Sequence, residues 1–188
     1  MRRLLPILCL TLAVLLGSTG VSESADFQKR VAAYQNGDFA TALREWKPLA
    51  EQGHADAQNS LGLMYRKGRG VPQNYETAFK WYRLAAEQGD ANAQNNLGGM
   101  YRVGQSVPQN EKTAVEWFRL AAEQGLADAQ TSLGFMYVNA QGIPQDYKAA
   151  VKWYRLAAEQ GTAFAQSNLG VMYSIGQGVI QDNVYAHM

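Results

Sequence analysis

The sequence predicts an all-α protein, an α-solenoid of stacked antiparallel helix pairs with about nine helices. Three observations predict this fold: a 36-residue period, two amphipathic helical stripes in each period, and helix start and stop residues at the same place in every copy. The recurring residues are Ala57, Ala93, Ala129 and Ala165; Gln58, Gln94, Gln130 and Gln166; Leu61, Leu97, Leu133 and Leu169; Gly62, Gly98, Gly134 and Gly170; and Met64, Met100, Met136 and Met172. A fixed period of about 20 to 50 residues is typical of proteins whose units bury their apolar faces by stacking on one another.

Residues 1–24 are predicted to be a secretory signal peptide. Arg2 and Arg3 precede an apolar run from Leu4 to Leu16, which is shorter than the roughly 20 residues needed to span a bilayer. Small residues after which cleavage could occur are Gly20, Ser22, Ser24 and Ala25. We therefore expect an exported protein, periplasmic or extracellular, with no membrane span after cleavage; an uncleaved anchor is the alternative.

Residues 25–53 are predicted to be a degenerate helix pair that caps the N-terminal end of the stack. Tyr34 and Gly37 keep the spacing of Tyr65 and Gly68 in the repeats, but the loop between the two helices is missing. Pro48 stands inside the second helix of this pair, where proline costs about 3 kcal/mol. We expect a kink or a break there, which is tolerable at the end of a stack.

Residues 54–89 are the first full repeat. Apolar residues at i, i+4, i+7 and i+8 predict its first helix, and apolar residues at i, i+3, i+4 and i+7 predict its second. They are Ala57, Leu61, Met64 and Tyr65 in the first helix and Ala78, Trp81, Tyr82 and Ala85 in the second. Gly68, Gly70 and Pro72 predict the loop between them, because glycine permits left-handed dihedrals and proline keeps the preceding residue extended.

The same signals mark residues 90–125 and 126–161 as the second and third repeats and residues 162–188 as an incomplete fourth. The predicted N-caps of the second helices are Asn74, Asn110, Asp146 and Asp182, and the predicted left-handed residues that end them are Gly53, Gly89, Gly125 and Gly161.

The C-terminal end is expected to be incompletely covered. Asp182 to Met188 only begins the second helix of the fourth repeat, so Leu169, Met172 and Tyr173 are predicted to be partly exposed. We interpret this end either as part of a truncated longer array or as a surface that docks another molecule, with self-association through it as one form of docking.

Gly62 and its equivalents stand mid-helix, where glycine costs about 1 kcal/mol relative to alanine. The predicted reason is close approach of the paired helix, with the ring of Tyr82, Phe118 or Tyr154 in the space of the missing side chain; a functional hinge is the alternative. The methionine column shares the stripe of the leucines, and it is predicted to lie in the core and not to bind metal.

No catalytic, cofactor-binding or metal-binding residues are predicted. The only cysteine, Cys9, lies within the predicted signal peptide, and neither His54 nor His187 has a plausible partner nearby in sequence. The formal net charge of +1 does not favour binding of nucleic acid or of an anionic membrane. A hydrolase site assembled from residues distant in sequence is the alternative.

From Ala55 to the C-terminus the repeated sequence is A-x-A-Q-x-x-L-G-x-M-Y-x-x-G-x-x-V-P-Q-[ND]-x-x-x-A-x-x-W-[YF]-R-L-A-A-E-Q-G. This run resembles the Sel-one-like repeat (SLR) family, relatives of the tetratricopeptide repeats. The resemblance implies a right-handed α-solenoid and a role as an adaptor or scaffold for other proteins. Cysteine-rich members are linked to binding or hydrolysis of β-lactams, but the mature chain has no cysteine, so this activity is not carried over.

The resemblance also implies that the first helix of each pair lines the concave side. The candidate partner-binding residues on that side are Asp56, Asn59, Arg66, Asn95, Arg102, Thr131, Phe135, Val138, Phe164 and Val171. They change from polar and basic to apolar along the stack, which predicts a peptide or partner helix that is acidic at one end and apolar at the other. Drift on a solvent-exposed face is the alternative.

The sequence therefore favours an exported protein–protein interaction scaffold that is not an enzyme and whose ligand is a protein or peptide. One alternative is an envelope enzyme or regulatory subunit acting on peptidoglycan or β-lactams. Another is a structural solenoid that assembles with itself.

Overall fold

The computed structural model describes residues 26–179, so the predicted signal peptide and the segment Asp182–Met188 lie outside it. After a helical segment over residues 26–35, the helices are α2 (Phe39–Glu51), α3 (Ala55–Lys67), α4 (Tyr75–Glu87), α5 (Ala91–Val103), α6 (Glu111–Glu123), α7 (Ala127–Val138), α8 (Tyr147–Glu159) and α9 (Ala163–Ile175). Over the described range these are nine helical segments with no strand, which confirms the all-α prediction.

The chain divides into two compact units, Met1–Pro48 and Leu49–Met188. The boundary falls inside α2, which continues through Pro48 to Glu51, so the proline does not break the helix. One proline removes only one helical hydrogen bond. Beyond it the helix is held by Ala50, which is buried and whose carbonyl accepts a hydrogen bond from Gln58.

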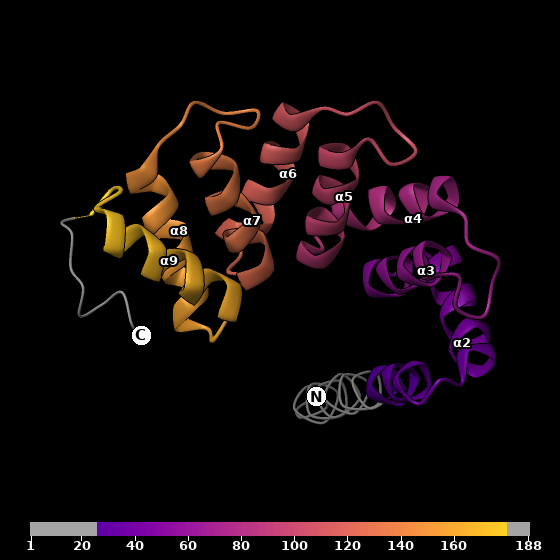
Figure 1. Ribbon diagram of the computed structural model, residues 1–188. Coiled ribbons are helices and arrows are strands. Elements are labelled where there is room, and N and C mark those ends of the chain that lie inside the picture. The colour runs from indigo at the N-terminus through magenta and orange to yellow at the C-terminus, as the bar shows by residue number, and fades with distance from the viewer. Residues whose placement is uncertain (1–25, 180–188) are drawn as a thin grey trace, which may run out of the picture. The chain divides into compact units, whose positions relative to one another are not determined.

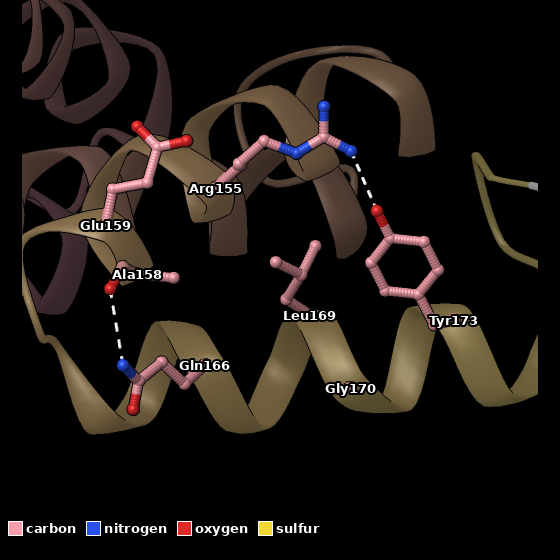
Figure 2. A pocket seen from close by; sticks show the side chains of 7 residues that line it. All are labelled: Arg155, Ala158, Glu159, Gln166, Leu169, Gly170 and Tyr173. Atoms are coloured by element: carbon pink, nitrogen blue, oxygen red, sulfur yellow. Dashed lines mark hydrogen bonds between the residues drawn. The ribbon is translucent and has the colours of Figure 1, made fainter. Parts of the chain in front are cut away.

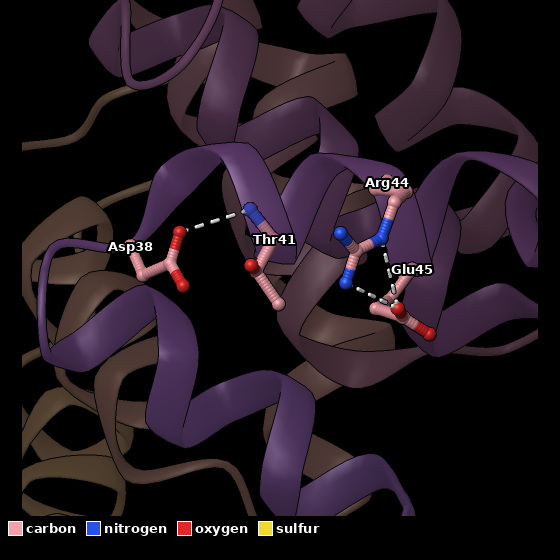
Figure 3. A network of polar contacts seen from close by, with 4 residues as sticks. All are labelled: Asp38, Thr41, Arg44 and Glu45. Carbon is pink, nitrogen blue, oxygen red and sulfur yellow. Dashed lines mark hydrogen bonds and ion pairs between the residues drawn. The ribbon is translucent and has the colours of Figure 1, made fainter.

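In the first unit, α2 begins at Phe39, directly after Asp38, and carries a small polar network (Figure 3). Oδ1 of Asp38 accepts a hydrogen bond from the backbone amide of Thr41 at 3.0 Å, and this bond lowers the pKa of the Asp38 carboxyl. Nε and Nη2 of Arg44 donate to Oε1 of Glu45 at 3.2 and 3.0 Å. These contacts lie on the exposed side of the helix.

In the second unit, consecutive helices stack as repeated pairs. α3 packs on α4, α5 on α6 and α7 on α8 within repeats, while α4 packs on α5, α6 on α7 and α8 on α9 between repeats. Within this unit, Figure 1 shows the first helices α3, α5, α7 and α9 along one side of the stack and the second helices α4, α6 and α8 along the other. The predicted repeat solenoid is confirmed.

Helix ends follow the predicted capping residues. Side-chain oxygens of Asn74, Asn110 and Asp146 accept hydrogen bonds from the amides three residues later at 2.8, 3.1 and 3.0 Å. Gly53, Gly89, Gly125 and Gly161 have φ angles of 98°, 95°, 91° and 85°, which is the left-handed conformation expected after a helix C-terminus. The fourth predicted N-cap, Asp182, lies outside the described residues.

One mid-helix glycine in each of α3, α5 and α7, namely Gly62, Gly98 and Gly134, lies against an aromatic ring of the following helix. A Cβ atom added to Gly62 would be 2.6 Å from the ring of Tyr82, and one added to Gly98 or Gly134 would be 2.9 Å from the ring of Phe118 or Tyr154. Real Cβ contacts are longer, so only glycine fits. This confirms close approach as the role of Gly62, Gly98 and Gly134. The methionine column is buried. For Met172 the expectation of partial exposure is wrong, because this side chain packs in one cluster with Val151 and Tyr154 of α8.

A glutamine joint, defined as the buried Gln58, Gln94 or Gln130 with its two partners, links each pair of helices to the preceding one. Its Nε2 donates to the carbonyl of Ala50, Ala86 or Ala122 at 3.1, 3.2 and 3.2 Å. Its Oε1 accepts from Nε2 of Gln88, Gln124 or Gln160 at 2.7, 2.8 and 2.9 Å. The buried amide is therefore satisfied on both sides by neighbouring helices.

The loops keep one backbone path although their residues differ. Gly68 and Gly104 end their first helices with φ angles of 66° and 73°, and Ala140 at the same phase has a φ of 53°. Ser106, at the phase of Gly70, has a φ of 61°. The third and second repeats thus hold a residue with a side chain in the left-handed region, which favours glycine.

Candidate functional site: the first-helix face

The first-helix face is the surface that α3, α5, α7 and α9 form beside their buried stripes. Because side chains three, four and seven residues apart share one side of a helix, each first helix contributes several residues to it. The candidate residues Asn59, Arg66, Asn95, Arg102, Thr131, Phe135 and Val138 are partly exposed, and Asp56, Phe164 and Val171 are exposed. The whole predicted set therefore keeps accessible surface.

At the polar end of the face, side chains of α3 and α5 are hydrogen-bonded to each other. Nη1 of Arg66 donates to Oδ1 of Asn96 at 3.0 Å, and Nδ2 of Asn96 donates to Oδ1 of Asn59 at 3.2 Å. The predicted residues Asn59 and Arg66 are thus brought together by Asn96, which the sequence reasoning missed. The guanidinium group of Arg66 is therefore already hydrogen-bonded to a neutral amide oxygen within the face.

Asn95 presents an unsatisfied acceptor. Its Oδ1 atom is buried and has no hydrogen-bond partner within residues 26–179. A buried acceptor without a donor costs about 1–3 kcal/mol. An N–H group brought by a bound chain would reduce that cost if it reached this atom.

Further along the face, three successive first helices surround one pocket of about 180 Å³. Its lining consists of Arg102 from α5, Thr131, Ser132 and Phe135 from α7, and Phe164 from α9. Four of these residues were predicted; Ser132 was not. Their convergence depends on the spacing between helices and could not be read from a single repeat.

The pocket combines a cation with aromatic surface. The guanidinium carbon of Arg102 lies 5.8 Å from the centroid of the Phe135 ring, which is within the range of a cation–π interaction. No carboxylate of the described chain lies within ion-pair distance of Arg102. The guanidinium N–H groups can therefore meet an acid group that enters from outside.

The two hydroxyl groups of the pocket act as acceptors toward a ligand. Oγ1 of Thr131 donates to the carbonyl of Ala127 at 2.8 Å, and Oγ of Ser132 donates to the carbonyl of Asp128 at 2.9 Å. Because both hydroxyl hydrogens are used within α7, only lone pairs are left for a bound group. The pocket thus offers positive charge, acceptors and ring faces side by side.

The C-terminal part of the face is apolar. Phe164, Val171 and Ile175 of α9 each expose slightly more than half of their surface. Val138 of α7 is partly exposed but does not line the pocket. The gradient from polar to apolar residues seen in the sequence is therefore present along the folded face.

Titratable groups with shifted pKa values lie away from the pocket. Burial raises the pKa of Asp90, the N-cap of α5, against the opposing effect of the hydrogen bond from Ala93. A hydrogen bond from Lys80 lowers the pKa of Glu76. His54 is exposed at the start of α3. Between residues 26 and 179, no three His, Cys, Asp or Glu side chains are grouped to hold a metal ion.

The four segments 55–90, 91–126, 127–162 and 163–188 each match the Sel1 repeat. The chain belongs to the Sel1 repeat family. Sel1 repeat proteins generally mediate protein–protein interactions and are generally not catalytic. Among the described residues of this Sel1 repeat protein, no helix is both long and apolar enough to cross a membrane.

Two solved structures are similar in fold and sequence. A Sel1 repeat protein from Oxalobacter formigenes has a TM-score of 0.78 and 39% identity, covering 84% of this chain and 62% of that one. A protective antigen present in uropathogenic Escherichia coli strains, which displays an SLR fold, has a TM-score of 0.79 and 39% identity, covering 92% of this chain and 38% of that one. This Sel1 repeat protein thus spans less than two thirds of the length of either relative.

A third structure shares the fold alone. Helicobacter pylori cysteine rich protein B has a TM-score of 0.54 at 22% identity, over 68% of this chain and 92% of that one. The comparison with curated proteins gave no match.

Proposed function

We propose that this Sel1 repeat protein is an exported scaffold that binds a protein or peptide on its first-helix face. The observation that carries the proposal is the pocket in which Arg102, Thr131, Phe135 and Phe164 converge from three successive first helices. Arginine and aromatic residues are the types that dominate binding energy at interfaces. The polar-to-apolar gradient of the face supports a ligand that runs along the stack.

The ligand that fits best is an extended peptide or partner helix with an acidic group beside an apolar side chain. The acid would meet Arg102, whose guanidinium has no carboxylate partner in the described chain, and the apolar side chain would lie between Phe135 and Phe164. Asp56, at the opposite end of the face, would face a basic or neutral part of the ligand. Arg66 is held by Asn96 and contributes less.

Export is supported by the basic start, the short apolar run and the small residues that precede Ala25. Intact-mass measurement of protein recovered outside the cytoplasm tests it. A mass that corresponds to loss of about residues 1–24 supports export with cleavage. A mass that retains Met1 to Gly17 would show an uncleaved anchor instead.

Partner binding is tested with the mature protein as bait in envelope extract, followed by affinity measurements with the captured partner. Replacing Arg102 and Phe135 together by alanine should weaken binding by about 2 kcal/mol or more, roughly 30-fold. The matched control replaces Lys80 and Lys152, on the second helices α4 and α8, by alanine and should leave the affinity unchanged. Equal losses from both pairs, or no loss from the first, would contradict the assignment of the face.

The alternative of an envelope enzyme or regulatory subunit acting on peptidoglycan or β-lactams has no specific structural observation in its favour. The similarity to the cysteine-rich protein concerns the fold alone. Turnover of a chromogenic β-lactam or of purified cell wall by the mature protein would revive that alternative.

A further inference from the structure

The first-helix pocket is the cavity of about 180 Å³ that is lined by Arg102, Thr131, Ser132, Phe135 and Phe164. Its arginine differs in its contacts from the arginine of the pocket between α8 and α9. Figure 2 shows the latter pocket, in which Nη2 of Arg155 donates to the hydroxyl of Tyr173 at 2.8 Å and Glu159 is a further lining residue. Arg102 lies instead against the Phe135 ring, and none of the five described residues around it in the first-helix pocket is acidic. Of the two pockets, the first-helix pocket therefore favours a carboxylate that comes from outside.

The size of the first-helix pocket limits what can enter it. Its volume of about 180 Å³ is below the roughly 300–1,000 Å³ of sites that enclose a whole small molecule. Because one water molecule takes about 30 Å³ in the liquid, the pocket has the space of about six waters. One amino-acid residue fits into this space, whereas an acidic side chain and a separate large apolar side chain do not fit together.

The lining offers three kinds of contact. Arg102 supplies positive charge and N–H donors in a planar fork that matches a carboxylate. The hydroxyl oxygens of Thr131 and Ser132 accept hydrogen bonds from a ligand, because each hydroxyl hydrogen is donated to a backbone carbonyl of α7. Phe135 and Phe164 supply apolar surface. A matching ligand therefore has an anion, an N–H group and an apolar side chain within a single residue.

The C-terminal residue of a peptide carries all three groups on one Cα atom. Its α-carboxyl, with an ordinary pKa of about 3.3–3.7, is ionised at neutral pH, and its amide N–H and its side chain are attached to the same carbon. An internal aspartate or glutamate uses its side chain for the anion, so the apolar side chain must come from a second residue. The terminal residue is thus the smaller of the two groups that match the lining.

We propose that the first-helix pocket binds the C-terminal residue of a protein or peptide whose last side chain is apolar. The terminal carboxylate pairs with Arg102, and the last side chain lies between Phe135 and Phe164. The last amide N–H donates to the hydroxyl oxygen of Thr131 or Ser132. This inference rests on the proposed function, and it specifies which part of the ligand enters the pocket.

Two synthetic peptide libraries test the proposal. Both contain the same random short peptides, one with a free C-terminal carboxylate and the other with a C-terminal amide. Each library is passed over the immobilised mature protein, and the retained peptides are sequenced by mass spectrometry. We expect retained peptides to have a free carboxylate and an apolar last residue. In fluorescence anisotropy, the amides of the same sequences should bind more weakly by about tenfold or more.

Protein variants locate the carboxylate. Arg102→Gln should abolish the preference for the free carboxylate over the amide, while the preference for an apolar last residue stays. The matched control is Arg119→Gln on the second helix α6, where the arginine is exposed, and it should keep both preferences. Thermal unfolding checks that both variants are folded. A carboxylate preference that persists in Arg102→Gln, or that is lost equally in Arg119→Gln, would overturn the proposal.

The libraries also separate failure of this inference from failure of the proposed function. Equal retention of acids and amides that share an internal acidic residue beside an apolar one would overturn the C-terminal assignment. If replacing Arg102 and Phe135 by alanine abolishes that retention, the proposed function is still supported. Retention that the double variant leaves unchanged would contradict both. Retention of neither library would overturn the C-terminal assignment alone, because the captured partner tests the proposed function independently.

Discussion

The contacts between stacked helices stay the same along the stack, whereas the first-helix face changes. In all three complete repeats, a glycine lies under an aromatic ring and a glutamine joint has bonds of 2.7 to 3.2 Å. Along the same repeats the first-helix face changes from the hydrogen-bonded Arg66, Asn96 and Asn59 to the pocket that contains Phe135 and Phe164. Packing therefore constrains the joints, and the face is free to be shaped by a partner.

The largest expected effect comes from comparing a phenylalanine packed between two helices with one on the first-helix face. Phe118 is almost fully buried over Gly98, whereas more than half of Phe164 is exposed. Phe118→Ala should lower the free energy of unfolding by about 3–5 kcal/mol, the usual cost of emptying a packed phenylalanine site. Phe164→Ala should lower it by less than about 1 kcal/mol. Similar losses of unfolding free energy in both variants, measured by chemical denaturation, would contradict the distinction between the packed contacts and the first-helix face.

Adjacent glycines in α5 give a second test. A Cβ on Gly98 would be 2.9 Å from the Phe118 ring and 3.2 Å from the Ala114 carbonyl, while one on Gly99 would meet nothing. Gly98→Leu should destabilise by about 1–3 kcal/mol through overpacking. Gly99→Leu should be neutral or stabilising by up to about 1 kcal/mol, because leucine favours the helix. A raised melting temperature for Gly98→Leu would contradict the packing role.

Tyr154 tests whether the ring or its hydroxyl stabilises the contact with Gly134. Its hydroxyl is buried without a hydrogen-bond partner in the part of the chain that the structure describes, and Phe118 occupies the same place in the second repeat. Tyr154→Phe should stabilise the protein by about 1 kcal/mol by removing an unsatisfied group. Lower stability of this variant at neutral pH would mean that the hydroxyl has a partner.

The pH dependence of Tyr154→Phe follows from the same burial, which raises the pKa of Tyr154 from 10.0 to about 12. The folded state then holds the phenol proton more tightly than the unfolded state. The contribution of the protonated Tyr154 phenol to the free energy of unfolding is full below pH 10, and it is lost as the pH rises through about 12. The gain from the substitution should therefore increase over this window. Denaturation of both proteins across it provides the measurement.

The smallest expected effect concerns a loop position where the residue has changed but the backbone has not. Ala140 has a φ of 53° at the phase of Gly68 and Gly104. Ala140→Gly should stabilise by about 0.5–1 kcal/mol, because a left-handed alanine costs about 1–2 kcal/mol and the flexibility of glycine in the unfolded chain offsets part of that. Asn139→Gly, at a φ of −98°, should give no gain. Thermal unfolding of both variants measures the difference.

Helix pairs, caps and the glycine–aromatic contact could be predicted because each depends on residues within one period. The glutamine joint also has a signal in the sequence, because Gln58 recurs every 36 residues on an otherwise apolar stripe and Gln88 recurs with the same period. A polar residue that recurs on a buried stripe needs a partner. The recurrence of Gln88 with the same period therefore identifies it as the partner of Gln58.

The site was predictable only in part. Helical phase placed Arg102, Thr131, Phe135 and Phe164 on one side, and the structure brings them around one pocket. Asn96 and Ser132 were missed because their roles depend on the distance between neighbouring first helices. The continuation of α2 through Pro48 could not be foreseen, since it depends on contacts of Ala50 with the next repeat.

The glutamine joint has a consequence for how such a chain changes length. Each joint consists of one bond inside a repeat, such as Gln124 to Gln94, and one bond back to the repeat before it, such as Gln94 to Ala86. Both halves recur at the joints of Gln58, Gln94 and Gln130, so inserting or excising 36 residues between them rejoins surfaces that already match. The two 39%-identical relatives are longer than this chain, which covers 62% and 38% of them. Whole repeats can thus be added or removed as units, which changes the length and chemistry of the first-helix face while the glutamine joints between repeats stay the same.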